Sequence, residues 1–248
     1  MDPRTIRHES VDSTNEQALA EVAAGRARHL DAHLARTQTA GRGTRGRTWI
    51  DEPDASVLAS VVVLPPGAVP HPEALTMAAG LALLETARDL GLGRAHLDWP
   101  NDLAVDGAKL AGVLVESRGV DPRTPHFVVG VGLNVAQRLF PEDLTRERAV
   151  TSLSLEGVTT ATSEVARVLI SKLRDELDRA LADAHTTARR YLDATDLRGE
   201  RVAITTGTER LEGELIALDL DRGLAVEQGA KIRWTSLAHV AAVELCEG

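Results

Sequence analysis

Aromatic residues and cysteine are scarce in this sequence. Its 248 residues include two Phe, one Tyr, three Trp and a single Cys. The lone cysteine, Cys246, stands two residues from the end of the sequence, so no disulfide can form within the chain. Because tryptophan is rare here, a tryptophan inside a candidate motif is more informative than usual.

Long apolar runs and an excess of positive charge are also missing. The longest apolar stretch, residues 57–64, is far shorter than the roughly 20 residues that a membrane helix needs. The N-terminus reads MDPRTIRHES and has no signal-peptide core. A formal charge of −9 disfavours non-specific binding to nucleic acid, which depends on neutralising phosphates. We therefore expect a cytoplasmic protein with no nucleic-acid or membrane partner.

Two weak ligand-binding patterns are rejected. His29 and His33 stand four residues apart, but they flank a segment without helical pattern and lack the glutamate of an HExxH motif. We interpret them as a surface pair and expect no metal site. Residues 130–132 (Gly-Val-Gly) do not begin a dinucleotide-binding fingerprint, because Val135 replaces its third glycine and no helix pattern follows.

The first two thirds of the chain mix strand and helix patterns. Residues 12–15 (Asp-Ser-Thr-Asn) are good N-caps, so the simplest interpretation is that they cap a helix ending near Gly25. Asp106 and Gly107 favour a tight hairpin turn. Strands are predicted over 5–11, 33–37, 56–64, 103–105, 110–115 and 127–131, and further helices over 72–90 and 164–185.

The pattern changes near residue 197, where short strands and turns begin to alternate. Five strands are predicted over 201–205, 211–218, 224–227, 232–235 and 240–245. Such spacing is typical of a small β-barrel. We predict two domains, 1–195 and 196–248.

A segment rich in glycine and arginine, residues 41–47, reads GRGTRGR and is followed by Thr48 and Trp49. Glycines let the backbone approach a ligand closely, and arginines offer N–H donors that match phosphate. A solvated basic loop or an RGG-like RNA contact is the alternative. On an acidic chain the pattern favours binding of a polyphosphate or an adenylate.

Five segments, taken in order, resemble motifs of the biotin–protein ligase family. They are DSTN at 12–15, QTAGRGTRGRTW at 38–49, WPNDL at 99–103, KLAGVLVE at 109–116 and GVGLN at 130–134. Each motif is weak alone, but their order makes the resemblance specific.

The resemblance implies an α+β fold, with a catalytic core like that of class II aminoacyl-tRNA synthetases and a C-terminal SH3-like β-barrel. It implies a ligase that uses ATP and Mg²⁺ to convert biotin to biotinyl-5′-AMP. The biotinyl group then passes to a lysine of a biotin carboxyl carrier protein or domain of an acyl-CoA or pyruvate-type carboxylase. Since DSTN begins at residue 12, we expect the class without an N-terminal DNA-binding domain, as a monomer or weak homodimer.

The resemblance also assigns roles to individual residues. Lys109 and Arg42 are the expected catalytic residues. The expected biotin-binding residues are Ser13, Thr14, Asn15, Gln38, Arg42, Gly43, Thr44, Lys109, Gly112 and Gly130. The expected ATP- and adenylate-binding residues are Arg42, Arg45, Arg47, Trp49, Lys109 and Asn134. For Lys109 the alternative is an exposed hairpin lysine without a catalytic role.

Two positions depart from the family pattern. Thr44 replaces an arginine of the usual GRGRxGR loop, and Asp98 stands where a basic residue usually precedes WPND. We predict that Thr44 weakens the hold on the adenylate, and that Asp98 worsens this effect or offsets it by pairing with Arg42 or Arg45.

Three other functions stay open at this point. A lipoate–protein ligase-like enzyme is disfavoured, because the RRxSGGG and HDxGN loops are absent. Thr44 and Asp98 leave room for a degenerate homologue that binds biotin or a carrier with weak activity. The third is an RNA- or partner-binding protein that uses the Gly/Arg loop.

Overall fold

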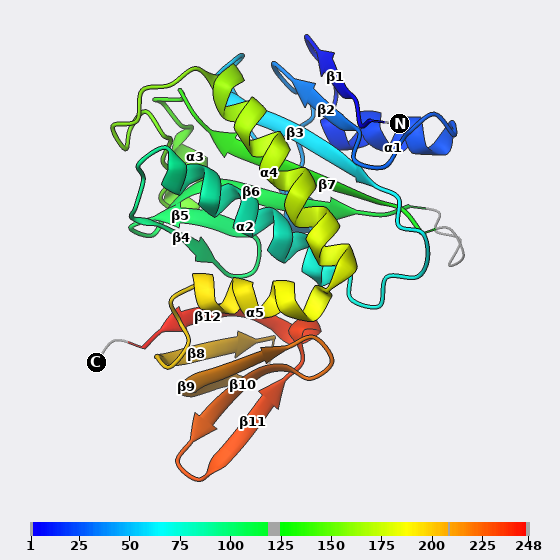
Figure 1. The fold of residues 1–248 in the computed structure, drawn as a ribbon. Helices are drawn as coiled ribbons and strands as arrows, with labels where there is room; N and C mark the ends of the chain where they lie inside the picture. Colours follow the sequence, from blue (N-terminus) through cyan, green and yellow to red (C-terminus); the bar gives the residue numbers. More distant parts are fainter. Residues whose placement is uncertain (1, 119–124, 208, 247–248) are drawn as a thin grey trace.

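A seven-stranded sheet forms the centre of the larger part of the molecule (Figure 1). The computed structural model describes residues 2–118, 125–207 and 209–246. The strand order is β1-β2-β3-β7-β6-β5-β4, with β1 and β2 parallel and the other neighbours antiparallel. The strands are β1 Thr5–His8, β2 Ala32–Ala35, β3 Ser56–Val63, β4 Ala95–Asp98, β5 Asp102–Val105, β6 Ala108–Glu116 and β7 Phe127–Asn134.

Helices cover both faces of this sheet. The described helices are α1 Thr14–Ala23, α2 Glu73–Asp89, α3 Glu142–Glu147, α4 Thr162–Ala182 and α5 Ala184–Ala194. Successive side chains of a strand point to opposite faces. Val61 and Val63 accordingly join the core under α2 and α4, whereas Val62 packs with Leu19 of α1 in a separate small cluster.

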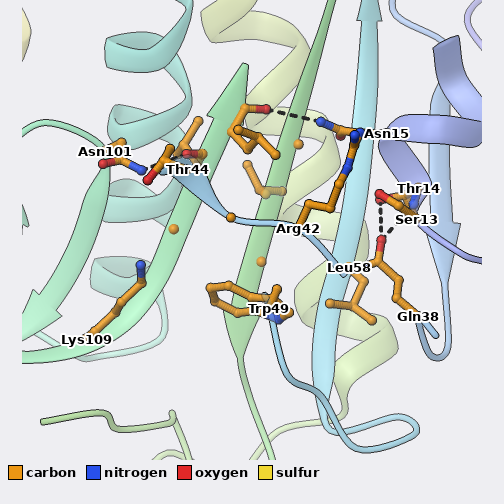
Figure 2. Close-up of a pocket in the computed structure, with 17 residues that line it drawn as sticks. Ser13, Thr14, Asn15, Gln38, Arg42, Thr44, Trp49, Leu58, Asn101 and Lys109 are labelled. Atoms are coloured by element: carbon orange, nitrogen blue, oxygen red, sulfur yellow. Dashed lines mark hydrogen bonds between the residues drawn. The ribbon is translucent and has the colours of Figure 1, made fainter. Parts of the chain in front are cut away.

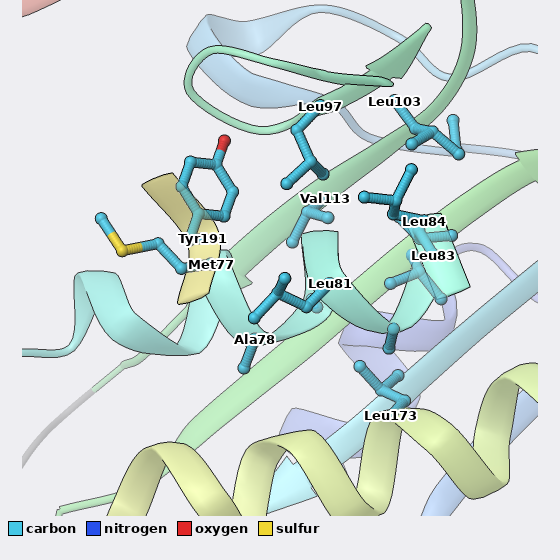
Figure 3. Packing of buried hydrophobic residues seen from close by; sticks show 14 of the residues in the cluster. Met77, Ala78, Leu81, Leu83, Leu84, Leu97, Leu103, Val113, Leu173 and Tyr191 are labelled. Carbon is cyan, nitrogen blue, oxygen red and sulfur yellow. The ribbon is translucent and has the colours of Figure 1, made fainter. Parts of the chain in front are cut away.

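Helix α2 is apolar on most of its surface because it is covered on several sides. Its side chains pack against the sheet, α4 and α5. Figure 3 shows Leu103 of β5 and Leu173 of α4 on opposite sides of α2, with Tyr191 of α5 nearby. A Cβ on Gly80 would lie 3.2 Å from both Leu97 and Tyr191, so the close approach of α5 needs a glycine there.

The remaining strands form a second sheet, antiparallel throughout, in the order β11-β10-β9-β8-β12. They are β8 Arg201–Thr206, β9 Arg210–Asp219, β10 Gly223–Gln228, β11 Lys231–Thr235 and β12 Val240–Leu245. Helix α5 lies between the two sheets (Figure 1). The apolar side of the second sheet, with Ile204 and Leu215, joins the same core cluster. The boundary between residues 195 and 196 stays a prediction.

Most of the predicted elements are present. The structure confirms the strand at 56–63, the helix at 73–89, the hairpin around Asp106 and Gly107, and all five C-terminal strands. The predicted strand 127–131 extends to Asn134 in the structure. The prediction ended too early because Gly130 and Gly132 lack the side chains that mark a strand in the sequence. Sequence patterns missed β4, α3 and α5. None of the described helices combines the length and hydropathy that spanning a bilayer requires.

The interpretation of His29 and His33 as a surface pair is wrong. His33 is buried in β2, and its ring stacks on that of His8 at a centroid distance of 5.3 Å. His29 instead contacts Asp178 through Nε2, at 2.9 Å. Burial, followed by repulsion from His8, lowers the pKa of His33 to about 4.

This depressed pKa predicts a loss of stability in mild acid. Above a pH of about 6.5, the pKa of histidine in the unfolded chain, His33 is uncharged in both the folded and the unfolded state. As the pH falls toward 4, the unfolded chain binds a proton that the folded chain does not, so stability declines by at most about 3 kcal/mol. Urea unfolding across this pH range should show a smaller decline for His33→Gln. For His239→Gln, a change at an exposed position, the free energy of unfolding should depend on pH as it does in the parent. Equal slopes for the parent and His33→Gln would contradict this linkage.

Candidate functional site

The candidate site lies on the α1 face of the large sheet, where the neighbouring strands β6 and β7 carry three glycines. In the pairing register, Gly132 of β7 lies between Leu58 of β3 and Gly112 of β6. In the neighbouring row, Gly130 lies between Ser60 and Leu114. Without side chains at the glycines, the backbone itself becomes the floor of a hollow.

We call this hollow the glycine-floored cavity. Figure 2 shows Lys109 and Asn101 on one side of it, Gln38, Thr14 and Asn15 on the other, and Trp49 between them. Its lining comprises Ser13, Thr14, Asn15, Gln38, Arg42, Gly43, Thr44, Trp49, Leu58, Asn101, Lys109, Gly112, Val113, Leu114, Gly130, Val131 and Gly132. The structure thus brings together all ten predicted biotin-binding positions.

The start of α1 supplies one polar wall. Thr14 donates to Gln38 Oε1 from its backbone N–H at 2.7 Å and from its hydroxyl at 3.0 Å. Ser60 Oγ lies 2.7 Å from Thr14 Oγ1 and 2.5 Å from Asn15 Oδ1. Ser13, Thr14 and Asn15 are each only 4% exposed. This buried network holds several donors and acceptors in fixed orientations.

The capping interpretation of residues 12–15 is confirmed in position but not in hydrogen bonding. Ser13 occupies the N-cap position, but its side chain makes no capping hydrogen bond. Asp12 instead accepts from Gln17 Nε2 and from the Ser13 backbone N–H. These hydrogen bonds, the one from Gln17 first, lower the pKa of Asp12. Ser13 and the two residues after it line the cavity instead.

Arg42 is fixed by two carboxylates at the cavity edge. Its guanidinium nitrogens lie 2.7 Å from Glu16 and 2.5 Å from Glu116. Glu116 also accepts from Asn15 Nδ2 at 2.7 Å, so the cation is linked to the polar wall. Sequence analysis did not identify Glu116 as a site residue, although it ends the KLAGVLVE segment.

The Gly/Arg loop closes over the cavity through Trp49. Backbone hydrogen bonds join Trp49 to Gly41 and Gly43 to Arg47, which folds the loop back on itself. The Trp49 ring lies directly on the backbone of β7, since a Cβ on Gly132 would be 2.5 Å from Cε2 of the ring.

Lys109 of β6 points into the cavity. Its ammonium lies 2.8 Å from Asp102 Oδ1 and 5.7 Å from the centre of the Trp49 ring. The side chain is 23% exposed, so the exposure that the hairpin-lysine alternative assumed is wrong, while the catalytic role of Lys109 stays a prediction. The partner Asp102 belongs to the WPNDL segment, which the hairpin of β5 and β6 brings beside Lys109.

A second hollow, the adjoining cleft, shares four residues with the first. The shared residues are Gly43, Thr44, Trp49 and Lys109, and the rest of its lining is Arg47, Thr48, Ile50, Asn134, Phe140, Leu144, Arg148 and Val150. Four of the predicted ATP-binding residues, Arg47, Trp49, Lys109 and Asn134, therefore line it. The Arg45 side chain lies outside the described part of the structure. Asn134 is buried and donates from Nδ2 to the Thr151 carbonyl at 3.0 Å.

The charge at Asp98 is neutralised by a residue that sequence analysis missed. Arg148 contacts Asp98 through one guanidinium nitrogen and Asp102 through the other, at 2.7 Å. The proposed pairing of Asp98 with Arg42 is wrong, because Arg42 binds other carboxylates. Arg148 belongs to none of the motifs. The only sequence signal for this ion pair was the acidic residue at position 98, because a partly buried carboxylate beside the site predicts a cation nearby.

Comparison with known proteins places this site in a family. The sequence profile of the biotin/lipoate A/B protein ligase family matches residues 8–134. The bifunctional ligase/repressor BirA of Salmonella typhimurium is 30% identical over 90% of this chain and 69% of its own length. The biotin–[acetyl-CoA-carboxylase] ligase of Paracoccus denitrificans is 40% identical over 50% of this chain and 52% of its own length.

The fold also has solved counterparts. The biotin protein ligase of Aquifex aeolicus, in complex with biotin and ATP, aligns with a TM-score of 0.79 at 22% identity. The alignment covers 98% of this chain and 99% of that one. This likeness confirms the predicted α+β fold, including the separate C-terminal sheet.

Adding a methyl group to the cavity floor should displace Trp49. In Gly132→Ala the new Cβ would overlap the ring, so the loop must move outward. We expect altered Trp49 fluorescence and faster proteolysis within residues 41–49. The Trp49 signal is obtained by subtracting the spectrum of a Trp49→Phe variant. Gly67→Ala is the matched control, because a Cβ there has no described atom within 4 Å apart from those of its chain neighbours. If Gly132→Ala behaves like Gly67→Ala, Trp49 does not rest on the glycine floor in solution.

Proposed function

The chain belongs to the biotin/lipoate A/B protein ligase family, and on this basis we propose that it is an ATP-dependent biotin–protein ligase. It converts biotin to biotinyl-5′-AMP and transfers the biotinyl group to a lysine of a biotin carboxyl carrier protein or domain. The carrier is part of an acyl-CoA or pyruvate-type carboxylase. One observation carries this proposal: two adjoining hollows share Lys109, Trp49 and the start of the Gly/Arg loop, so two substrates can meet there.

The glycine-floored cavity suits biotin. Biotin joins a neutral ureido ring to an apolar chain with a carboxylate, so its site needs apolar walls and a few fixed polar groups. Thr14, Asn15 and Gln38 supply oriented donors and acceptors at one end. The backbone at Gly112 and Gly130 supplies a close-fitting surface, and Lys109 stands at the border with the cleft.

The adjoining cleft suits the nucleotide. Asn134 lies there with its amide fixed to the Thr151 carbonyl and its oxygen available to a base edge. Trp49 provides an apolar face, and Arg47 lies on the exposed side. Mg²⁺ enters with ATP as part of that substrate.

The first chemical step joins two anions. A carboxylate oxygen of biotin attacks the α-phosphorus of ATP in line with the departing pyrophosphate. Positive charge is needed where the anions meet, and Lys109 lies at that border. Arg42 is the second cation, and Glu16 and Glu116 hold it in place beside the cavity. In the second step the carrier amine attacks the acyl carbon of the mixed anhydride, and AMP leaves.

We infer that Arg148 replaces the basic residue that usually precedes WPND. It lines the adjoining cleft, and its guanidinium contacts both Asp98 and Asp102. A cation therefore still stands beside the WPNDL segment, but it comes from position 148 and is shared between two carboxylates. This exchange supports an active enzyme over the degenerate alternative.

We propose that residues 1–195 form the catalytic domain and 196–248 a C-terminal domain. The last helix of the first part ends at Ala194, and the second sheet begins at Arg201. Within the described ranges, every residue that lines the two hollows comes from the first part of the chain, which leaves the C-terminal part available for contacts with the carrier.

The proposal is tested by mixing the protein with biotin, MgATP and an unmodified carrier domain. A biotin ligase releases pyrophosphate and adds one biotinyl group to the carrier lysine. Lipoate in place of biotin should give much less product. Calorimetric binding of biotin without any pyrophosphate release would identify the degenerate homologue, and the absence of biotin binding would overturn the proposal.

Changing Lys109 to alanine should lower adenylate formation by at least a hundredfold. The change removes the cation between the two hollows, but Asp102 keeps Arg148 as a partner, so the fold should persist. Lys172→Ala is a matched control, since Lys172 is 25% exposed and pairs with Asp89 at 2.9 Å, away from both hollows. Pyrophosphate release at the parent rate by Lys109→Ala would contradict the assigned role.

Thr44 should allow the reactive adenylate to escape. A threonine hydroxyl replaces a guanidinium, and a lost charged contact is worth roughly 1.5–3 kcal/mol, or about ten- to a hundredfold in release. We expect Thr44→Arg to lower biotin labelling of an unrelated lysine-rich protein at equal carrier biotinylation. Thr39→Arg, at an exposed position outside both hollows, should leave this labelling unchanged. Equal labelling by the parent and Thr44→Arg would show that Thr44 is compensated.

A further inference from the structure

Three potential metal ligands from distant parts of the sequence meet away from both hollows. They are His71 just before α2, His185 in the first turn of α5, and Asp221 in the turn between β9 and β10. His71 Nε2 lies 3.5 Å from Asp221 Oδ1, and His185 Nε2 lies 3.9 Å from Asp221 Oδ2. The ligand atoms all lie within 4.8 Å of one another. In Figure 1 the starts of α2 and α5 and the β9–β10 turn share one side of the molecule.

A fourth residue orients one of the imidazoles. Glu73 Oε1 lies 3.4 Å from His71 Nδ1, the ring nitrogen opposite the one that faces Asp221. When Nδ1–H of a neutral His71 points at Glu73, the lone pair of Nε2 lies on the side of Asp221. Histidines that bind metals are commonly held by a carboxylate in this way. The arrangement therefore has both the ligands and an outer carboxylate that orients one of them.

The turn that carries Asp221 has a fixed backbone. Asp219 Oδ1 accepts from the N–H groups of Asp221 and Arg222, at 3.0 and 2.9 Å. Gly223 follows with φ +101°, and a Cβ there would overlap the Thr235 carbonyl. The carboxylate of Asp221 is thus held near the histidines by a turn that has little freedom to move.

The chemistry of this donor set favours a transition-metal ion of the Zn²⁺ type. Two imidazoles and one carboxylate are typical zinc ligands, whereas Mg²⁺ and Ca²⁺ prefer oxygen ligands alone. Ligand atoms at the corners of a tetrahedron around zinc lie about 3.3 Å apart. Here the two histidines face different oxygens of Asp221, at 3.5 and 3.9 Å, and the three ligand atoms lie within 4.8 Å of one another. Asp221 and His185 are 68% and 44% exposed, so small rotations can close the gap.

We propose that His71, His185 and Asp221 bind a zinc-type ion, with water as the fourth ligand and Glu73 orienting His71. The ion links the turn of the C-terminal sheet to the first residues of α2 and α5. It therefore restrains the second sheet against the catalytic part. None of these residues lines the glycine-floored cavity or the adjoining cleft, so the inference stands apart from the ligase assignment.

The test is metal binding to chelator-treated, full-length protein. Calorimetry with Zn²⁺ should show a single ion per chain, and Co²⁺ should give the visible absorption of a four-coordinate site. His185→Ala and Asp221→Ala should each weaken Zn²⁺ binding by at least about tenfold, and Glu73→Gln by about tenfold. His185 and Asp221 are exposed, so these variants should fold normally. Zn²⁺ should raise the Tm of the parent but not that of His185→Ala.

The controls separate this site from others. His96→Ala removes a histidine outside the cluster and should bind Zn²⁺ as the parent does, and excess Mg²⁺ should not displace the ion. Absence of saturable Zn²⁺ binding would overturn the proposal. Equal affinity in the parent, His185→Ala and Asp221→Ala would also overturn it, because the ion would then occupy another part of the chain.

Discussion

The site depends on the absence of side chains at Gly112, Gly130 and Gly132, which lie in adjacent rows on the central strands β6 and β7. A methyl group at Gly132 would overlap the Trp49 ring, and one at Gly130 would lie 2.3 Å from Asn15 Oδ1. The sheet therefore fixes how closely the loop and the start of α1 can approach it. The polar wall and the covering tryptophan both take their positions from this bare backbone.

The cations around this floor are each paired with carboxylates. Arg42 contacts Glu16 and Glu116, Lys109 contacts Asp102, and Arg148 contacts both Asp98 and Asp102. Such pairs hold long side chains in one orientation and reduce the ordering cost when a ligand binds. An anionic ligand competes with these carboxylates for the same donors. The chain can therefore carry a net charge of −9 and still present cations where two anions must react.

Helix α5 packs between the two sheets and contacts elements of both parts of the molecule. Tyr191 packs on Gly80 of α2, and its ring meets that of Trp99 edge to face at 6.0 Å. Trp99 belongs to the same segment as Asp102, so the packing of α5 bears on the residues that position Lys109. Burial raises the pKa of the Tyr191 hydroxyl, which keeps it neutral within this core. The proposed ion site at the start of α5 would add a second connection along the same helix.

Sequence patterns alone were enough to predict the family, the order of the main elements and the segments that line the candidate site. These features are local: the valine-rich strand at 56–63, the Asp-Gly turn at 106–107 and the glycine pattern at 130–132 each depend on neighbouring residues. Only the tertiary structure identified Glu116 as a partner of Arg42 and Arg148 as the partner of Asp98. It likewise buried His33 against His8 and brought Asp221 to His71 and His185. Pairs so far apart in the chain meet through sheet register and helix packing, and no local periodicity or motif encodes such a contact.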